Sequence, residues 1–384
     1  MPGCTRAIRR TTIGIAGSAN LVADGRRRHD HAMRKRVPAL LFALLAAVSL
    51  VSACGTSSEA RTTEDGRTLI RYQGWAGQVT YPELAADLGY FDKVALDWVG
   101  NTTSGPQDIQ SAATGATDIG GAFNGAVVKL AAAGSPITSV ISYYGSDKEN
   151  FTGYYVLDNS PIRSARDLIG KKFGVNTLGA HHEFVAREWL ARQGLSNDEI
   201  DRVELTVVPP VNAEQALRQG QIDAVALFDI WRDEAVARGG VRPLFTDGDL
   251  FGAFSYGTYI VRDDFLARNR DAVADLTQGT ARAIRWAQTT PRDQVIAKFK
   301  DIITRRGREG ESPDKANYWK STGVAGPGGV TREQEIQLWI DWLVRNGELE
   351  SGKPSAKDLY TNEFNPYANG TYPENAGPDG KVVG

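Results

Sequence analysis

Residues 171–189, KKFGVNTLGAHHEFVAREW, decide the fold that this sequence predicts. Residues 173–175 have the pattern of a short buried strand, residues 176–179 that of a turn, and apolar residues from Phe184 onward recur at helical spacing. Where a turn joins a strand to a helix, free backbone N–H groups and the positive end of the helix dipole point at one place. The stretch therefore predicts a βα unit whose turn suits an anion or another hydrogen-bond acceptor, although a plain connection without a ligand explains it equally well.

Short strands and helices alternate on both sides of this stretch. Before it, strands are expected at 68–73, 94–99, from 118, and at 137–144, with helices at 82–88, 106–114 and up to 133. After it come a strand at 203–208, a helix at 213–218 and a strand at 222–228. Alternation of this kind builds parallel, doubly wound α/β sheets. Beyond residue 265 the pattern is helical, with amphipathic runs at 271–289, 291–304 and around 336–343.

Two stretches rich in aromatic and β-branched residues bracket the second group of strands. They are residues 153–159, GYYVLDN, and residues 257–264, GTYIVRDD. We predict that they are hinge strands, where the chain crosses from one lobe to the other and back. The predicted division is a first lobe of residues 67–156 and 257–384, including the C-terminal helices, and a second lobe of residues 157–256.

The N-terminal region has the pattern of an export signal. Three basic residues at 34–36 precede an uncharged apolar run at 37–51, and Ser52, Ala53 and Cys54 follow. This order predicts a signal peptide with small residues before its cleavage site. A single membrane anchor is the alternative, since the run is only slightly shorter than the ~20 residues of a spanning helix. We expect residues 1–53 to be an N-terminal extension and signal peptide, and residues 54–66 to be a flexible tether.

Charge and cysteine content narrow the function classes. Residues 54–384 carry 35 Lys and Arg against 44 Asp and Glu, and an acidic body argues against a nucleic-acid partner. Cys4 and Cys54 are the only cysteines, so the exported part has no internal disulfide. A lone cysteine in an exported chain needs a reason, and lipidation of Cys54 supplies one.

Five motifs carry a resemblance to a known family. They are VSAC at 51–54, Gly89-Tyr90-Phe91, AATGATDIG at 112–120, SPIRSARDLIGKK at 160–172 and QGQIDA at 219–224. With them the chain resembles, over about residues 68–345, the substrate-binding lipoproteins of ABC importers, in the branch for nitrate, taurine, aliphatic sulfonates and thiamine-precursor pyrimidines. It departs from that branch at 228–231, where the family often has Trp-Asp-Pro and this chain has FDIW.

The resemblance implies a fold, partners and a location. The fold would be the type II periplasmic-binding-protein fold, with two doubly wound α/β lobes, two hinge strands and a helical C-terminal extension. A small solute would be held in the cleft and passed to the membrane subunits of an ABC importer. A lipid on Cys54 would hold the protein, as a monomer, at the outer face of the cell membrane or in the periplasm.

Candidate ligand-binding residues lie where the predicted strands end, because open α/β sheets bind ligands outside the carboxyl ends of their strands. They are Gln73, Trp75, Asn101, Thr102, Phe123, Asn124, Tyr143, Thr177, Gly179, Ala180, His181, Asp229, Trp231 and Tyr256. Trp75, Asn124, Thr177 and Trp231 in particular are expected to line one crevice between the lobes.

The chemistry of these candidates favours a small polar solute with an apolar body. Their aromatic rings offer faces to a methylene chain or a flat ring. Lys and Arg are nearly absent, so neutral donors and helix N-termini would hold an anion. Asp229 either pairs with an ammonium or ring amine, as in taurine or an aminopyrimidine, or simply caps its helix.

Competing functions find less support in the sequence. The exported part has two histidines, His181 and His182, which point about 100° apart on a helix and do not readily share a metal. No cysteine and histidine spacing of a metal site, nucleophile elbow or phosphate-binding loop is present. We therefore expect no catalytic residues, metal or cofactor. An enzyme using an unmarked serine or carboxylate, or a surface-recognition protein on the same fold, remains the alternative.

Overall fold

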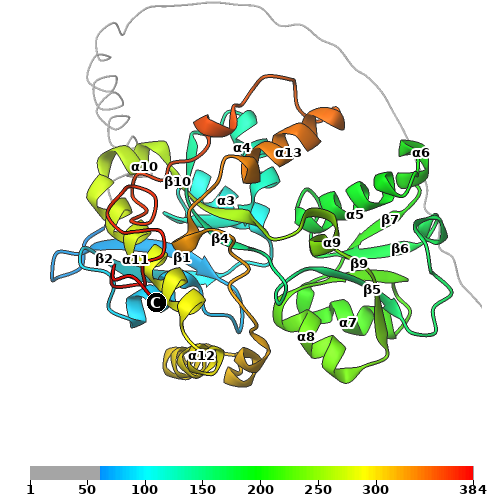
Figure 1. Ribbon diagram of the computed structural model, residues 1–384, viewed down its shortest axis with the longest axis horizontal. Coiled ribbons are helices and arrows are strands. Elements are labelled where there is room, and N and C mark those ends of the chain that lie inside the picture. Colours follow the sequence, from blue (N-terminus) through cyan, green and yellow to red (C-terminus); the bar gives the residue numbers. More distant parts are fainter. Residues whose placement is uncertain (1–60, 384) are drawn as a thin grey trace, which may run out of the picture. The chain divides into compact units, whose positions relative to one another are not determined.

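The computed structural model describes residues 61–383 (Figure 1). The predicted signal peptide, the predicted lipidation of Cys54 and the tether up to residue 60 lie outside these described residues. Between residues 61 and 383, no helix combines the length and the apolar character needed to cross a membrane.

The strands follow the predicted order closely. They are β1 (Thr68–Gly74), β2 (Val94–Asn101), β3 (Gly120–Phe123), β4 (Ile137–Ser146), β5 (Gly153–Leu157), β6 (Lys172–Val175), β7 (Glu204–Val207), β8 (Ala224–Leu227), β9 (Val241–Thr246) and β10 (Phe254–Arg262).

The helices fill the intervals between the strands and continue beyond β10. They are α2 (Tyr81–Asp87), α3 (Gly105–Ala113), α4 (Asn124–Ala132), α5 (His181–Arg192), α6 (Asn197–Ile200), α7 (Pro210–Arg218), α8 (Asp229–Arg238), α9 (Asp247–Phe251), α10 (Asp263–Arg268), α11 (Arg270–Thr289), α12 (Arg292–Arg306) and α13 (Gln334–Arg345), with short 3-10 turns that include η3 (Pro313–Tyr318).

The strands form three sheets in two lobes. The first lobe holds the pair β1-β2 and the sheet β3-β10-β4, and the second lobe holds the sheet β7-β6-β8-β5-β9 (Figure 1). β1 pairs parallel with β2, and β6 pairs parallel with β7 and β8. In contrast, β10 runs antiparallel to β3 and β4, and β5 runs antiparallel to β8 and β9. The α/β prediction is confirmed, but each lobe contains antiparallel pairs that the alternating pattern did not reveal.

The chain crosses between the lobes elsewhere than predicted. β5 lies inside the second-lobe sheet between β8 and β9, and β10 lies inside a first-lobe sheet between β3 and β4. The assignment of residues 153–159 and 257–264 as hinge strands is therefore wrong, because a strand bonded on both edges within one sheet is fixed to that lobe. The crossings are residues 147–152 and 247–253, so the predicted limits of the second lobe, 157–256, cut through both strands.

Residues 171–189 form the predicted strand, turn and helix. β6 is followed by a turn and by α5, whose apolar residues Phe184, Val185 and Leu190 are buried. Phe184 also meets residues of the first lobe, because its ring lies 5.1 Å from that of Phe123 and 4.2 Å from that of Trp342 in α13. One aromatic core therefore continues from α5 into β3 and α13, and it lies directly behind the cleft.

Asp108 in α3 is a buried carboxyl group without a cationic partner. One of its oxygens accepts a hydrogen bond from Gly121 N at 2.7 Å, and the other has no hydrogen-bond partner among the described residues. Burial raises the pKa of Asp108 to about 7, partly offset by that hydrogen bond. In the unfolded chain an aspartate has a pKa near about 3.9.

We expect this raised pKa to make the protein less stable as pH rises. Between about pH 4 and pH 7 the unfolded chain loses a proton that the folded chain keeps. The contribution of Asp108 to the free energy of unfolding therefore falls across that window and stays constant above it. Asp108→Asn should raise the melting temperature near pH 8 by a few degrees and flatten the slope between pH 5 and 8. Thermal unfolding at several pH values tests this, with the exposed Asp198→Asn as the matched change. If the melting temperature depends on pH equally in both variants, this explanation is wrong.

Candidate functional site

A cavity of about 180 Å³ lies between the two lobes. The first lobe lines it with the loop after β1, the ends of β3 and β4, residues of β10, and residues from α12 to Thr322. The second lobe lines it with the starts of α5 and α8, and the crossing at 150–152 completes the wall. For comparison, an engineered apolar cavity of about 150 Å³ binds benzene, so this volume suits a solute with one ring or a short chain.

Eleven of the thirty residues that line the cavity are Phe, Tyr or Trp. They are Trp75, Tyr81, Phe123, Tyr143, Tyr144, Phe151, Phe228, Tyr256, Tyr259, Phe299 and Trp319. Several pack on one another, with the rings of Tyr143 and Tyr259 stacked at 3.9 Å and those of Tyr144 and Tyr256 edge to face at 5.0 Å. Rings held in this way keep their faces in fixed positions, which favours a flat or apolar ligand body.

Asp229 is the one carboxylate among the described residues that line the cavity, and no Lys or Arg is among them. Its backbone has a φ of 49°, a left-handed conformation that Asp and Asn tolerate better than most residues do. Burial raises the pKa of Asp229 to about 6, against the opposing charge of Arg232. At neutral pH the group is therefore mostly ionised, while a modest fall in pH protonates it.

Asp229 also takes part in a contact across the cleft. Gln78 Nε2, on the loop after β1, donates to Asp229 Oδ2 at 3.3 Å. A ligand with an amino group or a protonated ring nitrogen would offer the same carboxylate a stronger donor, because hydrogen bonds to charged groups are strengthened when both partners are charged.

Arg232 lies close to Asp229 in sequence, but it has other partners. Its guanidinium donates to the carbonyl groups of Glu149 and Phe151 at 2.8 and 2.7 Å, pairs with Asp233, and stacks 3.9 Å from the centre of the Phe151 ring. The side chain is buried and does not line the cavity. It joins α8 to the first crossing instead of serving as an anion-binding group.

His181 joins the cavity wall to both crossings. Its Nε2 lies 2.9 Å from Asp247 Oδ2, and its ring stacks on Tyr256 at 3.8 Å. The other oxygen of Asp247 accepts hydrogen bonds from Ser146 Oγ and Thr152 N at 3.1 and 3.0 Å. Asp247 is fully buried, so one carboxylate holds the first crossing, the second crossing and α5 together.

His182 also lines the cavity but has a different environment. Its ring lies 4.7 Å from that of Phe228, and burial lowers its pKa well below the usual range, with His181 adding to the shift. The imidazole is therefore neutral at physiological pH, and it can present a donor or an acceptor but no charge.

Two helix N-termini of the second lobe reach the cavity without side-chain caps. α5 begins after Ala180 and α8 begins after Phe228, and neither of these N-cap residues supplies a capping hydrogen bond. β6 and β8 are parallel neighbours in the sheet, so the two helices start side by side. The first N–H groups of such helices suit an acceptor group of a ligand, and the α5 start confirms the βα turn predicted from residues 171–189.

Half of the sequence-predicted site residues line the cavity. They are Trp75, Phe123, Tyr143, Ala180, His181, Asp229 and Tyr256. The other half, Gln73, Asn101, Thr102, Asn124, Thr177, Gly179 and Trp231, do not line it. The expectation that Trp75, Asn124, Thr177 and Trp231 share one crevice is therefore wrong for three of the four.

Each residue outside the cavity has a structural reason. Asn124 donates to Glu335 O, towards the core, and the ring of Trp231 is buried 4.9 Å from that of Phe228. The hydroxyl of Thr177 donates to Leu178 O, and Gly179 N donates to the carboxylate of Glu183.

Of the remaining three, Gln73 and Asn101 belong to the separate β1-β2 pair, and Thr102 directly follows β2. Asn101 is exposed at the end of β2, and the hydroxyl of Thr102 donates to Ser104 O. Gln73 lies within β1, where its side-chain oxygen is buried without a partner among the described residues. At this end of the pair Trp75 reaches the cavity, whereas Gln73, Asn101 and Thr102 do not.

Among the lining residues that sequence reasoning missed are the crossing at 150–152 and two larger groups. One group comes from the loop and helix start at 77–81, and the other from α12 and the chain after it, at Phe299, Ile303, Ala316, Trp319, Ser321 and Thr322. The amphipathic pattern did predict α12, but it did not indicate which element its apolar face meets. Thr80 and Glu83 form a capping box that a sequence pattern can reveal, and it marks the start of α2 at the cavity.

Comparison with known proteins identifies a family. The model of the family described as NMT1/THI5 like matches residues 79–294, more than half of the chain. A protein of Escherichia coli (strain K12), provisionally named an aliphatic sulfonates-binding protein, is 31% identical over 157 residues, which cover 40% of this chain and 46% of that protein. The chain thus matches less than half the length of this relative.

Solved structures share the fold at lower identity. The nitrate-binding protein NrtA from Synechocystis PCC 6803 superposes with a TM-score of 0.64 at 14% identity, covering 83% of this chain and 93% of that chain. The alkanesulfonate-binding protein SsuA from Xanthomonas axonopodis pv. citri, bound to MOPS, gives 0.60 at 21% identity, covering 78% and 100%. An enzyme, the desulfurization enzyme DSZB, gives 0.54 at 17% identity, covering 78% and 97%. These similarities confirm the type II periplasmic-binding-protein fold.

Proposed function

Because the chain belongs to the NMT1/THI5 like family, we propose that it is an extracytoplasmic solute-binding protein that delivers a small solute to an ABC importer. Lipidation at Cys54, location at the outer face of the cell membrane, a monomeric state and the absence of catalysis are parts of this proposal. The observation that supports it most is the cavity to which both lobes contribute and whose volume suits one small solute.

The proposed mechanism is closure of the two lobes around the solute. A ligand in the cavity touches both lobes, so it favours the closed state by the difference between its affinities for the closed and open states. The crossings at 147–152 and 247–253 are the segments about which the lobes would move. The contact between Gln78 and Asp229 spans the cleft and belongs to the closed state. Membrane subunits of the importer would recognise that closed form.

The lining favours a flat heteroaromatic solute with an amino group, such as a thiamine-precursor pyrimidine. The aromatic walls provide apolar faces, and Asp229 provides the acceptor for an amine. A small sulfonate such as taurine is the second candidate, supported by the uncapped starts of α5 and α8 and by the name of the Escherichia coli relative. Taurine would place its ammonium on Asp229 and its sulfonate at a helix N-terminus. Nitrate has no apolar body to use the aromatic walls.

A thermal-shift screen of the purified protein tests the proposed function. The panel contains aminopyrimidines, taurine, alkylsulfonates including MOPS, and nitrate. A ligand at a hundred times its Kd stabilises the folded state by about 2.7 kcal/mol, which raises the melting temperature by several degrees. If no compound raises it, the proposed ligand classes are wrong. If a bound compound is consumed on incubation, as followed by NMR, the protein is an enzyme.

Asp229→Asn is expected to weaken the binding of an amino-bearing ligand by about tenfold or more. The variant keeps the left-handed backbone and a hydrogen-bond acceptor but loses the charge, and a hydrogen bond to a charged group contributes roughly 1.5–3 kcal/mol. Since the pKa of Asp229 is about 6, wild-type binding of taurine should weaken as pH falls from about 7.5 to about 5, and the variant should lack this dependence. Isothermal titration at both pH values measures the effect.

Glu234→Gln is the matched control, since Glu234 lies on the same helix, pairs with Arg238 and does not line the cavity. This control should bind like the wild type at both pH values. If Asp229→Asn also binds like the wild type, the carboxylate does not contact the ligand.

A further inference from the structure

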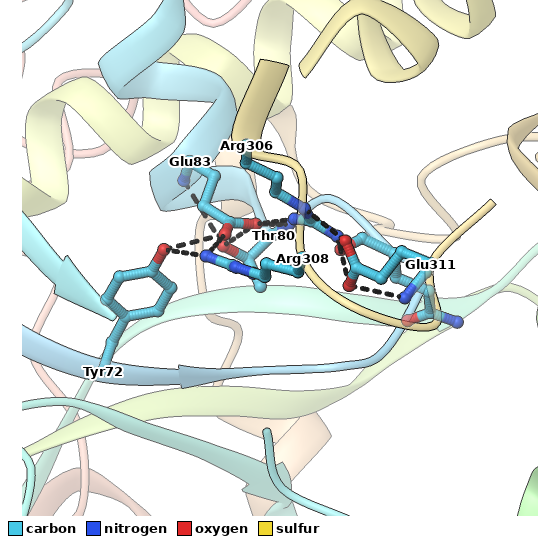
Figure 2. A network of polar contacts seen from close by, with 8 residues as sticks. Tyr72, Thr80, Glu83, Arg306, Arg308 and Glu311 are labelled. Carbon is cyan, nitrogen blue, oxygen red and sulfur yellow. Dashed lines mark hydrogen bonds and ion pairs between the residues drawn. The ribbon is translucent and has the colours of Figure 1, made fainter. Parts of the chain in front are cut away.

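Two arginines and two glutamates are buried together where α12 ends (Figure 2). Arg306 donates to Glu83 Oε2 at 2.9 Å and to Glu311 Oε2 at 2.7 Å, and Arg308 donates to Glu83 Oε1 at 2.7 Å. The exposed fractions of the four side chains are 11% or less. The charges balance, but the cost of desolvation makes such a buried network weak evidence for stability.

The network holds the backbone of the loop after β1. Glu311 Oε1 accepts a hydrogen bond from Gly77 N, Arg306 Nη2 donates to Gln78 O, and Glu83 Oε2 accepts from Thr80 N, each at 2.9 Å. Figure 2 shows these side chains between the strand that carries Tyr72 and the turn that carries Glu311. Three backbone groups within four residues are thus fixed by side chains from α2, from the last residue of α12 and from the turn after it.

The loop held in this way forms one wall of the cavity. It supplies Trp75, Gln78 and, at the start of α2, Tyr81. Gln78 also donates to Asp229 in the second lobe. A shift of the loop by a fraction of an ångström would move an aromatic face and the cross-cleft donor together, so the precision of the site depends on what holds residues 77–80.

The segment that holds the loop is also part of the wall. Phe299 and Ile303 of α12 line the cavity before Arg306, and Trp319 lines it after Glu311. All of these residues lie beyond residue 294, where the match to the family model ends. This side of the cavity is therefore formed by a part of the chain that the family model does not cover.

We propose that Arg306 and Glu311 are positioning residues for ligand binding, which fix the loop at 75–80 against a specificity wall formed by residues 299–322. The inference rests on the proposed solute-binding function, but it adds that the shape of the site is set by a segment outside the family-matched region. Neither residue lines the cavity, so each acts through the loop.

The double variant Arg306→Met, Glu311→Met separates positioning from stability. Replacing a buried ion pair by apolar residues of similar size is often neutral for stability, and Glu83 keeps Arg308 and Tyr72 as partners. Gly77 N and Gln78 O lose their partners, so we expect the melting temperature to fall, but by no more than in the control variant described below. Hydrogen exchange of the ligand-free protein, followed by mass spectrometry, should speed up at least about tenfold in the peptide that contains residues 75–80.

The binding of the panel compound that shifts the wild-type protein most gives a second readout. Its Kd should rise about tenfold or more in the double variant. Glu311→Gln keeps an acceptor for Gly77 N and should restore part of both effects. Arg71→Met is the matched control, because it breaks the ion pair with the buried Asp118 of the first lobe away from the cavity. It should lower the melting temperature without changing exchange at residues 75–80.

Trp319→Ala tests the wall itself, with Trp286→Ala as its control, since both indoles are partly buried against one apolar cluster and only Trp319 lines the cavity. Trp319→Ala should change the order in which panel compounds stabilise the protein, and Trp286→Ala should not.

Unchanged exchange at residues 75–80 in the double variant overturns the positioning role. If no compound stabilises the wild type, the proposed ligand classes are wrong, and the exchange measurement still tests whether Arg306 and Glu311 hold the loop.

Discussion

Asp247→Ala should be the most damaging single substitution at the crossings, lowering the free energy of unfolding by about 3–5 kcal/mol. The carboxylate is fully buried and accepts hydrogen bonds from Ser146 Oγ, Thr152 N and His181 Nε2. Removing it leaves a hydroxyl, an amide and an imidazole without their buried partner. Each buried unsatisfied group costs about 1–3 kcal/mol, and the total is a large part of the 5–15 kcal/mol that holds a typical domain folded.

Urea unfolding measures this loss, and Asp249→Ala provides the comparison two residues away. Asp249 is exposed and takes part only in the capping box with Thr246, so its loss should cost about 1 kcal/mol. Asp247→Asn, which keeps one acceptor, should fall between the two. If Asp247→Ala and Asp249→Ala unfold at the same urea concentration, the carboxylate does not hold the crossings together.

Gly257→Val is expected to cost about 3 kcal/mol or more and to abolish ligand binding. Gly257 lies within β10, and a Cβ atom there would stand 1.6 Å from Cε1 of Tyr144. Valine is otherwise favourable in strands, so the loss in the free energy of unfolding comes from the clash and not from the backbone preference. To make room, the Tyr144 ring must leave its place beside Tyr143 and Tyr256, and all three rings line the cavity.

A double-mutant cycle checks this explanation. Tyr144→Ala removes the ring that a larger residue at position 257 would strike, so Gly257→Val should cost much less in the Tyr144→Ala background than in the wild type. Gly248→Ala is the control, because a Cβ atom at that glycine meets its nearest neighbours at 3.6 Å, an ordinary contact. Additive losses in the cycle would show that Gly257 is required for some reason other than the Tyr144 ring.

The order of elements could be predicted because local patterns carry it. The strand, turn and helix at residues 171–189 appear as β6 and α5, with Phe184 and Leu190 buried as their spacing required. The location of the crossings could not be predicted in the same way. The runs at 153–159 and 257–264 have the composition of buried strands, and composition does not show which sheet a strand joins or which neighbours it pairs with.

The candidate site was predictable where it depends on a strand end and the helix that follows. Ala180, His181 and Asp229 were found by that rule, and they lie at the starts of α5 and α8. Asn124 obeys the same rule, but its amide turns towards Glu335 O, a partner 211 residues away in sequence. Trp319 and Phe299 follow no strand, so this rule does not find them. Their rings meet where α12 packs against η3.

The distance along the chain between Gly77 and Glu311 has a consequence for how the binding site matures. Gly77 in the loop is synthesised early, and Glu311, which binds its backbone N–H, is synthesised 234 residues later. The site is therefore incomplete until the last third of the chain has been made and packed. A truncated product that stops at residue 294 would keep the whole family-matched region. It would still lack Arg306 and Glu311, which hold the loop, and one side of the cavity.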